Sequence, residues 1–177
     1  KTSFEDKPKA VTATILFSDL VGFTDLSGEL RVSRISDILN SYLEVMNEVI
    51  FEFGGTIDKF IGDSIMVIFG APTETVPREQ AKQAAQCALA MQAAMEKLNQ
   101  EWQRQNMPEL QMRIGIHQGP VMVGNFGSKR RSDYTAIGST VNKASRIEGS
   151  CEPGQVFISA EVCDFLDDSM AKKIGVF

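Results

Sequence analysis

The sequence is poor in the residues on which disulfide, zinc and histidine chemistry depend. Its three cysteines, Cys87, Cys151 and Cys163, are odd in number and show no CxxC or Cys/His spacing, so they indicate neither a disulfide framework nor a zinc site. Reduced thiols are typical of a cytoplasmic protein. The single histidine, His117, has no nucleophile or orienting acid paired with it in the sequence, which favours a structural role over that of a general base.

The chain also lacks long apolar runs, internal repeats, low-complexity tracts and an excess of basic residues. No run reaches the length of a membrane span and no signal peptide is recognisable, so we expect no membrane contact from this chain. The formal net charge of -5 argues against a nucleic-acid partner, because such proteins carry a basic face. A small phosphate-bearing ligand stays open, since local geometry and a metal ion can override net charge.

What is present describes one ordinary globular domain. The 177 residues, of which 43% are hydrophobic and 23% charged, suffice for a substantial core and argue against disorder. Residues 1–9 are polar and contain proline, which predicts a linker, and residues 10–177 are predicted to form the domain. Because the chain opens at Lys1 rather than Met, we expect a fragment of a longer protein with an upstream regulatory domain.

Apolar periodicity and turn residues predict a mixed order of strands and helices. Predicted strands cover residues 10–17, 56–60, 65–69, 110–117, 120–124, 134–137 and 156–158, and predicted helices cover residues 31–53, 77–102, 138–148 and 161–166. Gly54-Gly55 ends the first long helix, Gly62-Asp63 forms a hairpin turn, and Gln118-Gly119 is expected to separate two strands. No strand–helix crossover repeats along the chain, which favours an α+β sheet with helices packed on one face.

Two acids stand at strand ends beside glycines. Asp19 ends the apolar strand that leads into the Gly22 turn, and Asp63 lies in the predicted hairpin turn. If the two strands are neighbours, both carboxylates emerge at one edge of the sheet and repel each other unless a divalent cation binds. Oxygen ligands favour Mg²⁺ or Mn²⁺, a setting suited to phosphoryl transfer. A reading as plain turn and capping residues is equally open from residue types alone.

Two further groups could contact a ligand. The turn of Gly22, Phe23 and Thr24 at a helix start offers backbone N–H groups to phosphate, although such a turn is common in proteins. Asn142 and Arg146 stand four apart and therefore share a helical face, where they could present an amide and a guanidinium. Without further context, a solvated surface pair is the favoured reading of Asn142 and Arg146.

Four motifs in this order resemble the catalytic domain of class III nucleotidyl cyclases, over residues 10–166. The motifs are FSDLVGFT at residues 17–24, DKFIGDSIM at residues 58–66, RIGIHQG at residues 113–119 and YTAIGSTVNKASR at residues 134–146. The resemblance implies a ferredoxin-like core sheet with the nucleotidyl cyclase fold. It also implies a head-to-tail homodimer, in which each active site takes residues from both protomers.

The same resemblance assigns roles to individual residues. Asp19 and Asp63 match the family's two metal-binding aspartates, with the Leu20 carbonyl as a further ligand for two Mg²⁺ or Mn²⁺ ions. Asn142 matches the residue that orients the ribose, and Arg146 matches the residue that faces the phosphates. The remaining assignments are substrate contacts: Arg113 resembles a triphosphate contact, and the backbone at Gly22, Phe23 and Thr24 would meet the polyphosphate.

Base choice in this family rests on two positions, which Lys59 and Thr135 match. Adenylyl cyclases resemble this chain in carrying Lys at the first position and Asp or Thr at the second, whereas guanylyl cyclases typically carry Glu and Cys. Lysine only donates hydrogen bonds and therefore suits the ring nitrogen acceptor of adenine. The donor groups of guanine instead pair with an acceptor such as a carboxylate. The pair therefore points to ATP. One departure is the family's late Lys-Gly segment, which residues 172–175 do not match convincingly.

We therefore predict an adenylyl cyclase catalytic domain that acts in signal transduction and converts ATP to 3′,5′-cyclic AMP and pyrophosphate. Two alternatives remain, namely a guanylyl or relaxed cyclase and a catalytically inactive regulatory domain. The second alternative would normally have lost one of Asp19, Asp63, Asn142 or Arg146, and all four are present. A diguanylate cyclase is not indicated, because Gly54-Gly55-Thr56 is not the glycine-acid turn that such an enzyme needs.

Overall fold

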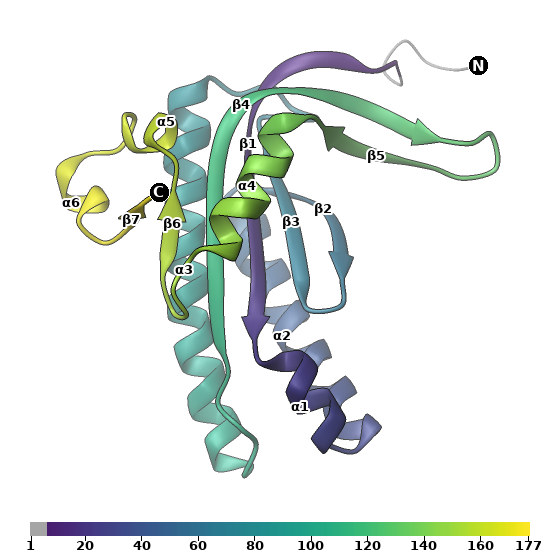
Figure 1. Cartoon of the computed structure of the whole chain (residues 1–177), viewed down its shortest axis with the longest axis vertical. Coiled ribbons are helices and arrows are strands. Elements are labelled where there is room, and N and C mark those ends of the chain that lie inside the picture. Colours follow the sequence, from purple (N-terminus) through teal and green to yellow (C-terminus); the bar gives the residue numbers. More distant parts are fainter. Residues whose placement is uncertain (1–6) are drawn as a thin grey trace.

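A computed structural model describes residues 7–177 (Figure 1). Its strands are β1 (Lys9–Val21), β2 (Thr56–Ile61), β3 (Ser64–Phe69), β4 (Gln111–Gly127), β5 (Ser132–Ile137), β6 (Val156–Ile158) and β7 (Gly175–Val176). Its helices are α1 (Phe23–Glu29), α2 (Val32–Glu52), α3 (Pro77–Arg104), α4 (Ser139–Gly149), α5 (Ala160–Cys163) and α6 (Asp168–Ala171). Residues 1–6 of the predicted linker lie outside the described part, and β1 already begins at Lys9.

One mixed sheet organises the described residues. Its strands follow the order β2-β3-β1-β4-β6-β7, and β5 pairs with β4 off this path. The pairs β1–β3, β1–β4, β2–β3 and β4–β5 are antiparallel, and β4–β6 and β6–β7 are parallel. The ends of β4 and β5 project together as an arm beyond the rest of the sheet (Figure 1). The predicted α+β class is confirmed.

Successive residues of β1 face two separate cores. Leu16 and Leu20 belong to the larger core, which α2 and α3 cover, whereas Ala13 and Ile15 belong to a smaller core that includes Ala144 of α4. The two long helices therefore share one face of the sheet, but the prediction that the helices pack on one face does not hold for α4, whose Ala144 packs in the smaller core. The shorter α4 lies on the other face, and Figure 1 shows it in front of the sheet with α2 and α3 behind.

Local sequence signals account for the boundaries of α2 and of the hairpin. Gly54 follows α2 with φ +78°, a left-handed conformation that glycine adopts without steric cost. The hairpin β2–β3 turns at Gly62-Asp63, and Gly62 also has a positive φ of +60°. Both features agree with the sequence predictions.

The predicted break at Gln118-Gly119 is wrong, because β4 runs without interruption from Gln111 to Gly127. Its partner β1 pairs with residues 111–123 without a break, including Thr14 with Gln118 and Ala13 with Gly119. The Gln118 amide is buried and donates to Thr14 Oγ1 at 3.0 Å and to the Pro77 carbonyl at 2.8 Å. Gly119 gives room to α4, because an added Cβ would lie 2.6 Å from Thr140 Oγ1. These residues therefore serve packing across the sheet rather than a turn.

The carboxyl-terminal prediction is partly wrong. The helix expected over residues 161–166 is the single turn α5, which Ser159 caps by accepting a hydrogen bond from the Val162 N–H at 3.4 Å. The short α6 and β7 follow it and were not predicted. Four residues in α6 and two in β7 are too few to show a periodicity.

Candidate active site

Two predicted metal ligands meet where β1 and the β2–β3 hairpin end. Because β1 pairs with β3, the end of β1 lies beside the hairpin turn that carries Asp63. The Leu20 N–H donates a hydrogen bond to Asp63 Oδ2 at 2.8 Å, which places this carboxylate beside the residue that follows Asp19. The expectation that both acids emerge at one edge of the sheet agrees with this contact.

Arg113 neutralises Asp19 within the protomer. The two residues face each other across the β1–β4 pair, and the guanidinium contacts the carboxylate at 3.1 Å through Nε and at 2.8 Å through Nη2. A further bond of 3.3 Å runs from Arg113 Nη1 to the Gly149 carbonyl at the end of α4. The hydrogen bonds to Asp19 raise the pKa of Arg113. Arg113, the predicted triphosphate contact, thus binds Asp19, a predicted metal ligand.

Glu148 is a third acid in this group, and the sequence reading missed it. Burial and the neighbouring Asp19 raise the pKa of Glu148 to about 8, an effect that Arg113 partly opposes. Its Oε1 atom is buried and has no hydrogen-bond partner. A glutamate near a helix end is ordinarily solvated, so only the packing of α4 on the sheet could have revealed it.

Two glycines of β4 hold α4 close to the sheet. An added Cβ at Gly115 would lie 2.2 Å from the Glu148 backbone nitrogen, and one at Gly119 would meet Thr140. The Thr140 hydroxyl donates to the Pro120 carbonyl at 2.7 Å, which fixes the start of the helix on the same strand. The docking leaves the side of α4 that carries Asn142 and Arg146 exposed, one helical turn apart.

The Gly22 turn joins β1 to α1. Gly22 has φ +78° and its carbonyl accepts the first helical bond, from the Leu26 N–H at 3.0 Å. The Phe23 side chain is buried in the larger core, and Thr24 is exposed. Any contact of Phe23 with a substrate would therefore come from its backbone.

Asp58 joins the two predicted base-reading residues. The Thr135 hydroxyl donates a hydrogen bond to Asp58 Oδ2, and the Lys59 ammonium lies 3.8 Å from Asp58 Oδ1. Lys59 comes from β2 and Thr135 from β5, so the fold brings together residues that are far apart in sequence. Asp58 was not predicted as a site residue, although its place directly before Lys59 was a possible signal.

The donor set at Asp19 and Asp63 fits a hard divalent cation. Both side chains supply carboxylate oxygens, the ligands that Mg²⁺ and Mn²⁺ prefer, and Arg113 already occupies Asp19 as a cation would. Glu148, whose pKa is raised first by burial and then by Asp19, adds a third acid to this end of the sheet. Among residues 7–177, no group of three or more His, Cys, Asp or Glu side chains is arranged to hold a metal ion.

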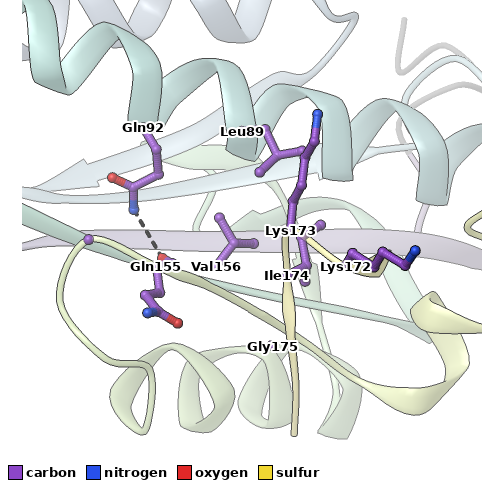
Figure 2. A pocket seen from close by; sticks show the side chains of 9 residues that line it. Leu89, Gln92, Gln155, Val156, Lys172, Lys173, Ile174 and Gly175 are labelled. Carbon is purple, nitrogen blue, oxygen red and sulfur yellow. Dashed lines mark hydrogen bonds between the residues drawn. The ribbon is translucent and has the colours of Figure 1, made fainter. Parts of the chain in front are cut away.

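The segment compared with the family's late Lys-Gly motif lies elsewhere. A pocket of about 400 Å³ is lined by Lys172, Lys173, Gln92 and neighbouring residues of α3, the loop before β6 and the chain end. In Figure 2, Gln92 donates to the Gln155 carbonyl, at 3.0 Å, and the side chains of Lys172 and Lys173 extend in different directions. These lysines precede β7, which β4 and β6 separate from β1 and Asp19.

His117 is buried on β4, 3.9 Å from Glu161 Oε2 through its Nδ1 atom. Burial, and then the nearby Lys143, lower its pKa, against the opposing effect of Glu161. Its Nδ1 atom has no hydrogen-bond partner. These surroundings agree with the structural role that the sequence favours.

The comparison with known families identifies the class of protein. The "Adenylate and Guanylate cyclase catalytic domain" family matches residues 6–175. The chain therefore belongs to this family of nucleotidyl cyclase catalytic domains, as the motifs predicted. Domains of this family generally use divalent metals.

Curated relatives share part of their length with the chain. "Adenylate cyclase 1" of Rhizobium meliloti is 38% identical over 136 residues, which are 77% of this chain and 20% of the relative. "Adenylate cyclase" of Anabaena cylindrica is 41% identical over 140 residues, 77% of this chain and 26% of the relative. The chain thus spans about a quarter or less of these two proteins. In residues 7–177, no helix is both long enough and apolar enough to cross a membrane.

Solved structures share the fold but include both nucleotide classes. The adenylyl cyclase CyaB from P. aeruginosa is 42% identical with a TM-score of 0.88, covering 90% of this chain and 82% of that chain. The guanylyl cyclase Cya2 is 41% identical with a TM-score of 0.86, covering 90% and 80%. These nearly equal identities do not separate ATP from GTP as the substrate.

Proposed function

We propose that this chain is an adenylyl cyclase catalytic domain that forms 3′,5′-cyclic AMP and pyrophosphate from ATP. The observation that carries the proposal is the bond from the Leu20 N–H to Asp63, which sets this carboxylate beside the residue that follows Asp19 and so supports a shared cation site. Lys59 and Thr135, held together through Asp58, support ATP as the substrate. In this proposal the cyclic AMP product acts in signal transduction. The domain would work in the cytoplasm, where ATP is available.

The acidic end of the sheet provides the reaction centre. Asp19, Asp63 and the Leu20 carbonyl would hold two divalent ions, Mg²⁺ or Mn²⁺. When bound, these ions activate the ribose 3′-hydroxyl for in-line attack on the α-phosphate and neutralise phosphate charge. Arg113, now on Asp19, is within reach of the same centre and would turn to the triphosphate. The backbone at Gly22, Phe23 and Thr24 would bind polyphosphate oxygens.

The exposed face of α4 would complete the site of a second protomer. Asn142 would orient the ribose, and Arg146 would stabilise the negative charge that develops at the α-phosphate. Within one protomer, the arginine that reaches Asp19 is Arg113, whereas Arg146 is exposed. This arrangement supports a site to which α4 of one chain and the acids of another contribute.

Exposed apolar residues support a homodimer. Met122 and Ile137 pair directly on the β4–β5 arm and are 39% and 46% exposed, and Phe60 of β2 is 44% exposed. Apolar surface of this kind is typical of interaction sites. A solved guanylyl cyclase domain from Blastocladiella emersonii, 26% identical, is described both as a non-canonical dimer and as a monomer. Because the chain spans only part of its curated relatives, we further propose a regulatory domain elsewhere in a longer protein.

Turnover of ATP and GTP by the purified chain with Mn²⁺ tests the proposal. We expect 3′,5′-cyclic AMP and pyrophosphate, with a higher kcat/KM for ATP than for GTP. The Asp63→Asn variant serves as the control and should lose most of this activity. A higher kcat/KM for GTP would make the chain a guanylyl cyclase, and no cyclic product from either nucleotide would make it an inactive regulatory domain.

A further inference from the structure

Asp58 is a buried carboxylate between the buried Thr135 and the exposed Lys59. Its side chain is 2% exposed, whereas that of Lys59 is 45% exposed. A buried carboxylate is costly unless it is paired and hydrogen-bonded. The partners of Asp58 are the Thr135 hydroxyl and the Lys59 ammonium, so its burial depends on the two residues that would read the base.

A β-bulge gives Asp58 this position. Ile57 pairs with Val67 and Lys59 pairs with Met66, which leaves Asp58 without a partner in the β2–β3 ladder. Adjacent residues of a regular strand point to opposite faces, but an extra residue in a bulge changes the direction of its side chain. The bulge therefore lets Asp58 and Lys59 lie together beside Thr135 of β5.

The direction of the hydrogen bond follows from the chemistry of the two groups. An ionised carboxylate only accepts, so the single hydroxyl proton of Thr135 is donated to Asp58. The other acceptor near this hydroxyl, the Ala136 carbonyl, is 3.5 Å away and too distant to compete. The Thr135 oxygen then keeps only lone pairs for a ligand, and it can accept a hydrogen bond but not donate one.

We infer that Asp58 is a positioning residue that makes Thr135 an obligate acceptor and thereby selects adenine over guanine. This inference rests on the proposed function and names how its site chooses a base. Adenine carries an amino donor at its position 6, which suits such an oxygen. Guanine carries a carbonyl acceptor at the same position and would face an unpaired lone pair. A threonine with a free proton could serve either base, so the selectivity comes from Asp58.

The Asp58→Asn variant tests this inference. The asparagine amide has the size of the carboxylate but can donate to Thr135, which frees the threonine proton for the guanine carbonyl. We expect the ratio of kcat/KM for ATP to that for GTP to fall at least about tenfold. Because both nucleotides are measured on one preparation, a loss of folded protein cancels from the ratio. The Asp37→Asn variant, which alters an exposed aspartate of α2, should leave the ratio unchanged.

A second substitution separates this role from a structural one. In a Thr135→Val background the hydroxyl is absent, so Asp58→Asn should change the ratio no further. An unchanged ratio in the single Asp58→Asn variant, or an additional fall in the double variant, would overturn the inference about Asp58. Neither result would contradict the proposed cyclase function. A wild-type chain that cyclises neither nucleotide would instead overturn the proposed function itself.

Discussion

Arg113 has two possible partners, and the choice between them depends on what else is bound. Without a cation or nucleotide it forms a two-point contact with Asp19, next to Asp63 and the buried Glu148. A divalent cation would compete for the same carboxylate oxygens. On the proposed function, a cation on Asp19 would release Arg113, which would then be free to contact phosphate.

Removing Arg113 should destabilise the empty protein more than the metal-bound one. We expect Arg113→Ala to lower the free energy of unfolding by about 1 kcal/mol in EDTA, because the Asp19 pair is partly exposed. With Mn²⁺ the difference from wild type should shrink, since the cation replaces the lost charge. Thermal unfolding under both conditions measures this, with Arg104→Ala at the end of α3 as control. Equal destabilisation with and without Mn²⁺ would contradict it.

His117 predicts a dependence of stability on pH. Burial and Lys143 lower its pKa in the folded chain below the ordinary value of 6.5, so the unfolded chain binds the proton more readily. His117 should therefore contribute a loss of stability as the pH falls below about 6.5, by at most about 1.4 kcal/mol per pH unit for one proton, against the opposite contribution of Glu148, whose raised pKa favours the folded state at lower pH. The free energy of unfolding of wild type, measured relative to that of His117→Gln, should fall between pH 7 and pH 5, because Glu148 is common to both chains. A variant as pH-sensitive as wild type would show that other groups carry the effect.

At the scale of elements, the position of α4 depends on the glycines beneath it. Gly115 lets the helix backbone approach β4 so closely that a Cβ would overlap the Glu148 nitrogen. Asn142, Arg146 and Glu148 all belong to this helix. The close approach of Gly115 to α4 therefore determines where these three residues lie.

Gly115→Ala should displace α4 and impair both stability and activity. The added methyl meets backbone rather than a flexible side chain, so we expect a loss of about 1–3 kcal/mol in unfolding free energy and a strong loss of turnover. The control is Gly28→Ala in α1, where an added Cβ would meet nothing within 4 Å. Chemical denaturation and the ATP assay provide the two measurements, and a Gly115→Ala variant as stable and active as the control would refute this packing role.

The sequence predicted elements whose signals are local. The apolar spacing over residues 31–53 and the glycines after it suffice for α2, and Gly62-Asp63 suffices for the hairpin. The continuous β4 was missed because Gln118 and Gly119 are turn residues in most settings, and only their contacts with Thr14 and Thr140 explain them. Asp58 and Glu148 escaped notice for the same reason, since long-range packing creates their surroundings. The roles of the remaining site residues stay predictions.

The proposed site takes residues from two chains. Asp19 and Asp63 lie together at the end of β1, whereas Asn142 and Arg146 are presented outward on α4. In a head-to-tail pair with two-fold symmetry, each chain would give its acids to one site and its α4 to the other. In a mixed dimer, a chain with altered acids and a chain with an altered α4 can then still form one complete site, from the intact α4 of the first chain and the intact acids of the second.

Mixing inactive variants tests whether each active site is shared between two chains. Asp19→Ala and Arg146→Ala should each lose most cyclic AMP formation alone. Their mixture should recover about a quarter of wild-type activity, because half of randomly paired dimers would hold one intact site of two. A mixture of Asp19→Ala with Asp63→Ala should recover nothing, since every site would lack one acid. Recovery only in the first mixture is the predicted result, and no recovery despite demonstrated subunit exchange would contradict a shared site.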